Sequence, residues 1–176
     1  RTRRQRQMCI RDNAYITALV QGEQNPNIIY AGAGAAWTYA SAGFSGGSMY
    51  KSNDGGNNWN NISLKDSLGN VDQKFRSISR MVIDPNDDDI LTIATWAGSS
   101  LANDNAAGFI YRTEDGGNTW NEIYQAGPQE RITQLVSSPK DSKIIYASVS
   151  QVGVLKSTDG GKSWYNPGNL GLTGSL

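Results

Sequence analysis

One nine-residue pattern occurs three times along the chain, and it constrains the fold more than any other feature. The copies read KSNDGGNNW at residues 51–59, RTEDGGNTW at 112–120 and KSTDGGKSW at 156–164. Each contains a basic residue, Ser or Thr, any residue, Asp, two Gly, two polar residues and Trp. Self-similarity at periods of tens of residues indicates stacked supersecondary units. The chain is therefore predicted to contain three equivalent units.

A second pattern precedes each copy of the first. It consists of a short apolar run, a turn that contains Pro26, Pro85 or Pro139, and then a β-branched run. Pro with polar neighbours is typical of turns, and the flanking Ile, Val and Tyr runs favour strands. Each unit is thus predicted to have four short strands. They cover about 15–20, 28–33, 48–52 and 59–62 in the first unit, 78–83, 90–95, 109–113 and 120–124 in the second, and 132–136, 144–149, 153–157 and 164–166 in the third.

Four strands per repeat are typical of a β-propeller blade. We expect an all-β chain, a partial β-propeller made of three four-stranded antiparallel blades that belong to a larger propeller. A β-sandwich gives no reason for three equivalent hairpins, and a β-helix has shorter, more uniform coils. The expected blades cover about residues 13–63, 75–124 and 130–176.

The first 12 residues differ from the rest. They hold five arginines against Asp12, whereas residues 13–176 hold the remaining 11 basic and 15 acidic side chains, a net charge of −4. Residues 1–12 resemble translated sequencing-adapter read-through at the end of a metagenomic gene fragment, and we expect a non-native or disordered segment there. The alternative is a basic arm for nucleic acid or acidic lipid. The mild acidity of residues 13–176 argues against a nucleic-acid partner. The chain has no apolar run of 18 residues, so no membrane span is predicted.

The repeated hairpin has a local structural explanation. An Asp carboxylate can accept backbone N–H groups across its own turn, and Gly-Gly allows the positive φ angles of a tight connection. The Trp then covers the hairpin and buries on the order of 150–250 Å². We therefore assign structural roles to Ser52, Asp54, Gly56 and Trp59, to Thr113, Asp115, Gly117 and Trp120, and to Ser157, Asp159, Gly161 and Trp164.

The motif Ser/Thr-x-Asp-Gly-Gly-x-x-Trp resembles the Asp box, or BNR repeat. The resemblance covers nearly all of residues 14–168 and points to a superfamily of propellers. That superfamily includes xyloglucan-hydrolysing glycosidases, sialidases, sortilin-type receptor domains and photosystem II assembly factors. Its members share a fold and differ in function, so the resemblance implies architecture and leaves activity open.

No catalytic site is expected in this stretch. The absence of histidine excludes a His general base, a Ser-His-Asp triad and His-bearing zinc sites. A sialidase resemblance would imply an arginine triad and a Tyr-Glu nucleophile pair, and Phe75–Ile78 only echoes the family's F-R-I-P segment. A xyloglucanase resemblance would imply two opposed carboxylates, and residues 112–117 continue instead as an ordinary hairpin through Trp120. We expect no catalytic residue, no metal and no cofactor, and whether the parent is an enzyme stays open.

Ligand binding is expected on the face opposite the Gly-Gly hairpins. In a four-stranded meander, the second-to-third-strand loops, 33–47 and 96–108, lie at the same end as the inter-blade loops, 63–75 and 124–130. Loops on a rigid scaffold usually carry binding, and flat aromatic rings stack on sugars. Polar residues of the inter-blade loops are Lys65, Asp66, Asp72, Gln125, Gln129 and Glu130. The expected ligand-binding residues are Trp37, Tyr39 and Trp96, with packing of Trp37 and Trp96 between blades as the alternative.

Two further expectations complete the prediction. Asp87–Asp89 are expected to form a solvated turn rather than a calcium site. The chain as a whole is expected to be part of a secreted or periplasmic propeller, carbohydrate-active or carbohydrate-binding in the manner of glycoside hydrolases. Its partners would be a polysaccharide or protein ligand and the remaining blades of the same chain. The alternative is a non-enzymatic, protein-binding propeller of the sortilin or assembly-factor kind.

Overall fold

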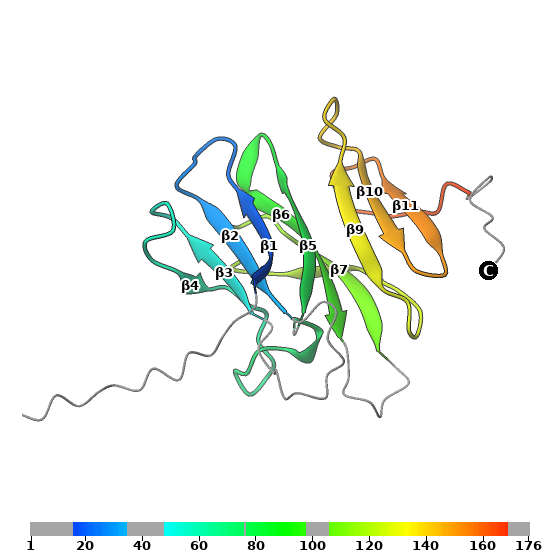
Figure 1. The fold of residues 1–176 in the computed structure, drawn as a ribbon, viewed down its shortest axis with the longest axis horizontal. Helices are drawn as coiled ribbons and strands as arrows, with labels where there is room; N and C mark the ends of the chain where they lie inside the picture. The colour runs from blue at the N-terminus through cyan, green and yellow to red at the C-terminus, as the bar shows by residue number, and fades with distance from the viewer. Residues whose placement is uncertain (1–15, 35–47, 76, 98–105, 169–176) are drawn as a thin grey trace, which may run out of the picture.

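Three antiparallel sheets lie side by side in the computed structural model, which describes residues 16–34, 48–75, 77–97 and 106–168 (Figure 1). The first sheet contains β1 (Ile16–Gln21), β2 (Ile29–Ala33), β3 (Met49–Ser52) and β4 (Asn60–Asn61), hydrogen-bonded in that order. The second contains β5 (Ile78–Asp84), β6 (Asp87–Ala97), β7 (Ala107–Thr113) and β8 (Asn121–Gln125), also in chain order.

The third sheet has fewer strands than the other two. It contains β9 (Ile132–Ser137), β10 (Ile145–Val149) and β11 (Gly153–Ser157), in the order β11-β10-β9. An isolated bridge between Lys156 and Tyr165 stands where the fourth strand was predicted. A 3-10 turn, η2 (Gln73–Phe75), precedes β5, and no helix among the described residues has the length and apolar character needed to cross a bilayer. The predicted all-β architecture of three antiparallel blades is confirmed.

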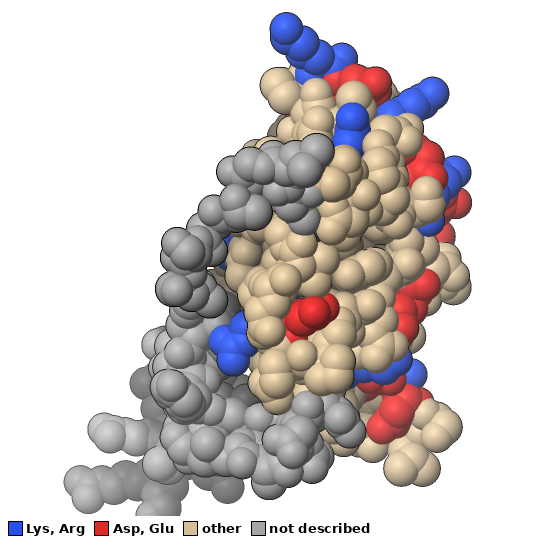
Figure 2. All heavy atoms as spheres, turned by 90° about the vertical axis from the view of Figure 1, so that its right-hand side faces the viewer, with Lys and Arg blue, Asp and Glu red and all other residues tan. Residues whose placement is uncertain are grey.

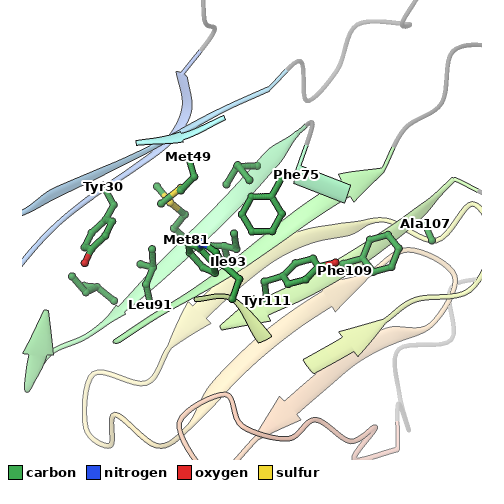
Figure 3. Packing of buried hydrophobic residues seen from close by; sticks show 12 residues of the cluster. Tyr30, Met49, Phe75, Met81, Leu91, Ile93, Ala107, Phe109 and Tyr111 are labelled. Atoms are coloured by element: carbon green, nitrogen blue, oxygen red, sulfur yellow. The ribbon is translucent and has the colours of Figure 1, made fainter. Parts of the chain in front are cut away.

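The first and third sheets pack against opposite faces of the second sheet and bury both faces of its strand β7. Every residue of β7 is buried, whereas β10 alternates between buried and exposed or half-buried positions. Successive side chains of a strand point to opposite faces, so continuous burial marks a sheet covered on both faces. One apolar cluster, which includes Tyr30, Met49 and Leu91, lies between the first two sheets (Figure 3). A second cluster, which includes Ala94 and Leu135, joins the second sheet to the third.

The prediction of a solvated turn at Asp87–Asp89 is wrong for the turn and for Asp88, whereas Asp87 and Asp89 are exposed. The turn consists of Pro85 and Asn86, and all three aspartates belong to β6, which begins three residues earlier than expected. Asp88 is only 6% exposed. Its carboxylate accepts hydrogen bonds from the backbone N–H groups of Gln24 (3.1 Å) and Asn25 (2.7 Å) in the first sheet. The neighbouring sheet supplies these donors, and this is why the carboxylate is buried rather than solvated.

Candidate functional site

The three Gly-Gly hairpins share one hydrogen-bond arrangement. In the first, the Ser52 hydroxyl donates to Asp54 Oδ1 (2.8 Å) and accepts from Gly56 N (2.8 Å). Asp54 also accepts from the backbone N (2.8 Å) and the side-chain Nδ2 (2.6 Å) of Asn58. Gly56 has φ +92°, which favours glycine. The same contacts join Thr113, Asp115, Gly117 and Thr119 in the second hairpin, and Ser157, Asp159, Gly161 and Ser163 in the third.

The hairpin carboxylates are hydrogen-bond acceptors held in their ionised form. Hydrogen bonds from Asn58 lower the pKa of Asp54, and those from Thr119 lower the pKa of Asp115 to about 2. Burial acts to raise the pKa of Asp159, but hydrogen bonds from Ser163 and Ser157 outweigh it and bring the value to about 2. A general acid needs the opposite shift. The geometry therefore fits a structural role for these three carboxylates.

The three hairpin tryptophans have different surroundings. Trp59 is 41% exposed and donates its ring N–H to Gly56 O of its own hairpin (3.0 Å). Trp120 is 9% exposed and donates to Ile62 O of the preceding sheet (2.8 Å). The Trp164 ring nitrogen is buried without a hydrogen-bond partner among the described residues. Only Trp120 of the three is thus hydrogen-bonded across an interface between sheets.

A buried tyrosine and a glutamate meet on the second sheet. The Tyr111 hydroxyl donates to Glu122 Oε2 (2.7 Å), which also accepts from Lys74 Nζ (2.7 Å). Burial, together with Glu122, holds the pKa of Tyr111 far above its usual range. A nucleophilic phenol needs a lowered pKa, so this pair is built for packing and not for attack on a substrate.

The end of the molecule opposite the hairpins carries the aromatic ring that the sequence singled out. Figure 1 shows the β1–β2, β5–β6 and β9–β10 turns at one end and the β8–β9 connection at the other. Trp96 lies at the end of β6 and is half-buried. The Arg131 guanidinium lies over its ring, 4.5 Å from the centroid. Trp37 and Tyr39 lie outside the described residues.

Arg131 is held in place by the β10–β11 turn. Its backbone N donates to Ser150 Oγ (2.7 Å), and its carbonyl accepts from Ser150 N (2.8 Å). Gln129 and Gln151, on either side of this contact, have φ angles of +65° and +66° and are the non-glycine residues with positive φ in the described part of the chain. Residues in sparsely populated backbone regions are often found at functional sites. We name Trp96 and Arg131, together with Gln129 and Gln151, which lie close in the chain to Arg131 and to its partner Ser150, the Trp96 platform.

Of these four residues, the sequence singled out Trp96 as a ligand-binding candidate and named Gln129 only as a polar residue of an inter-blade loop. Arg131 and Gln151 were missed. No local pattern marks them, because the contact of Arg131 with Trp96 depends on how β9 packs beside β6. Other loop residues serve local turns: Asp66 accepts from Leu68 N and Asn70 N (2.9 Å each). Among the described residues, no group of three potential metal ligands converges.

Comparisons with known proteins agree with the architecture. No protein-family model matches the chain, and no curated protein sequence does. Among solved structures, the GH74 xyloglucanase from Xanthomonas campestris is similar with a TM-score of 0.59 and 16% identity, over 87% of this chain and 20% of that one. The α-L-arabinanase from Penicillium chrysogenum is similar with a TM-score of 0.54 and 18% identity, over 87% and 48%. YCF48 from Cyanidioschyzon merolae has a TM-score of 0.50 and 13% identity, over 86% and 36%.

These likenesses concern the fold. The chain spans between about a fifth and a half of the length of these three proteins. Identities of 13–18% carry no residue roles from one protein to another. The three sheets of this chain have the arrangement of consecutive blades in a β-propeller.

Proposed function

We propose that the chain is part of a secreted Asp-box β-propeller that binds a polysaccharide at the Trp96 platform. The observation that supports this most directly is the Trp96 ring, half-buried at the loop end and held under Arg131 at 4.5 Å. A ring fixed in this way offers its remaining surface and edge to the C–H groups of a sugar without losing conformational entropy on binding.

The polar groups around the ring suit hydroxyl-rich ligands. Arg131 supplies several N–H donors in a fixed planar arrangement, and the amides of Gln129 and Gln151 both donate and accept. Gln129 N donates to Ala106 O (2.6 Å), and Ser150, the neighbour of Gln151, donates its N–H to Arg131 O (2.8 Å). Shallow apolar surfaces with a few well-placed polar groups are the usual form of a carbohydrate site.

The fold relatives guide the choice of ligand. Two of the three are described as a xyloglucanase and an arabinanase, so xyloglucan and arabinan are the first polymers to test. A second candidate, a non-enzymatic propeller that binds a protein through the same loops, is also compatible with the likeness to YCF48.

Affinity electrophoresis and calorimetry with xyloglucan and arabinan test the proposal. We expect Trp96→Ala to weaken binding about tenfold or more and Arg131→Ala to weaken it severalfold. Trp59→Ala is the matched control, because Trp59 is an exposed tryptophan of the first hairpin, at the other end of the molecule. Equal binding by wild type and Trp96→Ala would contradict the platform. Failure to bind any polysaccharide, together with saturable binding of a protein through the same residues, would favour the second candidate.

A further inference from the structure

The first and third sheets carry the same three side chains at the same register. Val20, Tyr30 and Lys51 are paired across β1, β2 and β3. The equivalent row of the third sheet is Val136, Tyr146 and Lys156, paired across β9, β10 and β11. In both rows the lysine amino group lies over the tyrosine ring, at 5.3 Å in the first and 5.8 Å in the third. We call these the Val-Tyr-Lys rows.

The second sheet covers the first row with the start of β6. The Tyr30 hydroxyl donates to the backbone carbonyl of Asp88 (2.9 Å), and Lys51 Nζ lies 2.7 Å from Asp89 Oδ1. Tyr30 is fully buried as a result. Asp88 adds its carboxylate to the backbone N–H groups of the β1–β2 turn. Two consecutive carboxylates at the start of a strand therefore complement the row and its turn.

The third row is preformed and uncovered. Val136 is 56% exposed and Tyr146 is 39% exposed, although the equivalent Tyr30 is fully buried. Figure 2 shows this side of the molecule, which is mostly uncharged, with charged side chains mainly along its margins. An exposed Val and Tyr beside a lysine, in the arrangement that is buried elsewhere in the same chain, indicate a binding surface.

The turn beside the third row also matches its counterpart. Ile144 N donates to Asp141 O (3.0 Å), as Ile28 N donates to Asn25 O (3.0 Å). Ser138 N donates to Ile144 O (2.8 Å), as Gly22 N donates to Ile28 O (2.8 Å). The backbone positions of 140 and 141 thus correspond to those of Gln24 and Asn25, which receive the Asp88 carboxylate, although Lys140 N donates to Ser138 Oγ (3.3 Å) and would exchange that acceptor for the carboxylate.

We propose that the Val136-Tyr146-Lys156 face receives a further β-sheet whose second strand opens with two consecutive carboxylates, as β6 does with Asp88 and Asp89. Charge supports this partner, because the third sheet and its β9–β10 turn carry Lys140, Lys143 and Lys156 against one carboxylate, Asp141. The first sheet of a second copy of this chain is not a matching partner. It lacks the two carboxylates, because Pro26 and Asn27 occupy the positions equivalent to Asp88 and Asp89. The partner is therefore a sheet of different sequence.

The mismatch with a second copy provides the test. Asn27→Asp gives the first sheet the carboxylate equivalent to Asp89 without changing side-chain size. The position is suitable, because Asn27 Oδ1 lies over Gly55 as Asp89 Oδ1 lies over Gly116. We expect head-to-tail association in which the new carboxylate meets Lys156 of the next copy. Sedimentation velocity of the full chain should show a self-association constant at least about fivefold higher than wild type, the equivalent of roughly 1 kcal/mol.

Three comparisons decide the result. Lys156→Met in the Asn27→Asp background should return association to the wild-type level, and Pro26→Asp added to Asn27→Asp should strengthen it further. Asn53→Asp is the matched control, since it adds the same charge on the exposed hairpin of the same sheet. Association of Asn27→Asp no stronger than wild type would overturn the proposal. So would an equal gain with Asn53→Asp, or a gain that persists after Lys156→Met.

Discussion

The two interfaces between the sheets share a backbone arrangement and differ in chemistry. In the first interface, two carboxylates of the second sheet contact the first sheet. Asp88 accepts hydrogen bonds from the β1–β2 turn, and Asp89 forms an ion pair with Lys51. In the second interface, Thr92 and Ser142 stand where the first has Tyr30 and Asp88. They line a small cavity of about 10 Å³ together with Ile145 and Gly160.

The second interface has neutral acceptors at these positions, and its ion pair, Lys162 Nζ to Glu114 Oε1 (3.4 Å), lies on the exposed hairpins. Arg112, equivalent to Lys51, donates from Nε to the carbonyl of Gly160 (3.0 Å), and Asn86 Nδ2 donates to Ser142 Oγ (3.3 Å). Repeated backbone geometry thus fixes where neighbouring sheets touch, while the residues at those points decide which sheets fit. A charged contact and a neutral one cannot be exchanged without leaving a buried group unpaired.

Removal of the Asp88 carboxylate is expected to have the largest effect. Asp88→Ala removes a buried carboxylate and leaves the backbone N–H groups of Gln24 and Asn25 without their acceptor, at a cost of about 2–3 kcal/mol in the free energy of unfolding. Ser142→Ala, the equivalent change in the second interface, should cost less than about 1 kcal/mol. Urea denaturation of both variants checks this, and equal losses would show that the two interfaces do not differ.

A substitution at Gly22 tests how closely the Asp88 carboxylate is enclosed. A Cβ at this position would lie 2.6 Å from both Cγ and Oδ2 of Asp88 and 2.7 Å from Asn25 O. Gly22→Ala must displace the carboxylate and is expected to destabilise the fold by about 1–3 kcal/mol. The equivalent residue of the third sheet is Ser138, and Ser138→Ala should change stability by less than about 0.5 kcal/mol. A thermal melt in which both variants behave like wild type would refute the close contact.

A carboxylate placed in the second interface should be unfavourable. Ser142→Asp puts a negative charge in the cavity that Asp84 also lines, and Asn86 N, the donor equivalent to Gln24 N, is already bonded to Asp84 Oδ1 (2.9 Å). The expected loss is about 1 kcal/mol, and it should shrink in high salt. Ser142→Asn is the neutral control. If Ser142→Asp instead stabilises the fold, a carboxylate at this point of the sheet is favourable whatever the neighbouring charges, and the proposed difference between the two interfaces is wrong.

The sequence predicts what is local. The repeated Ser/Thr-x-Asp-Gly-Gly pattern predicted three hairpins and three sheets, since each hairpin makes its hydrogen bonds within a few residues. The fourth strand of the third sheet was overestimated: only the Lys156–Tyr165 bridge forms there. Strand ends depend on packing as well as on pattern, and the last unit has less of its surface covered.

The contacts between sheets could not be predicted from the sequence. Asp87–Asp89 has the composition of a solvated turn, and only the donors of Gln24 and Asn25, more than 60 residues away, explain why Asp88 is buried. The same holds for Trp96, whose partner Arg131 comes from the next sheet. Both the best-buried carboxylate and the candidate binding platform are thus set by sheet stacking, which no local pattern encodes.

Alkaline pH should weaken the first interface, and this is the smallest of the expected effects. Burial acts to lower the pKa of Lys51, but hydrogen bonds with Asp89 and Tyr30 outweigh it and raise the pKa; burial raises the pKa of Tyr30. A raised pKa contributes stability that is present below the unfolded-state value, about 10 for both groups, and is lost as pH rises through the folded-state value. Lys51→Arg keeps its charge at these pH values. The free energy of unfolding of wild type should therefore fall relative to Lys51→Arg as the pH rises above about 10, by about 1 kcal/mol or less. Parallel pH profiles would show that the Lys51–Asp89 pair adds nothing to the first interface.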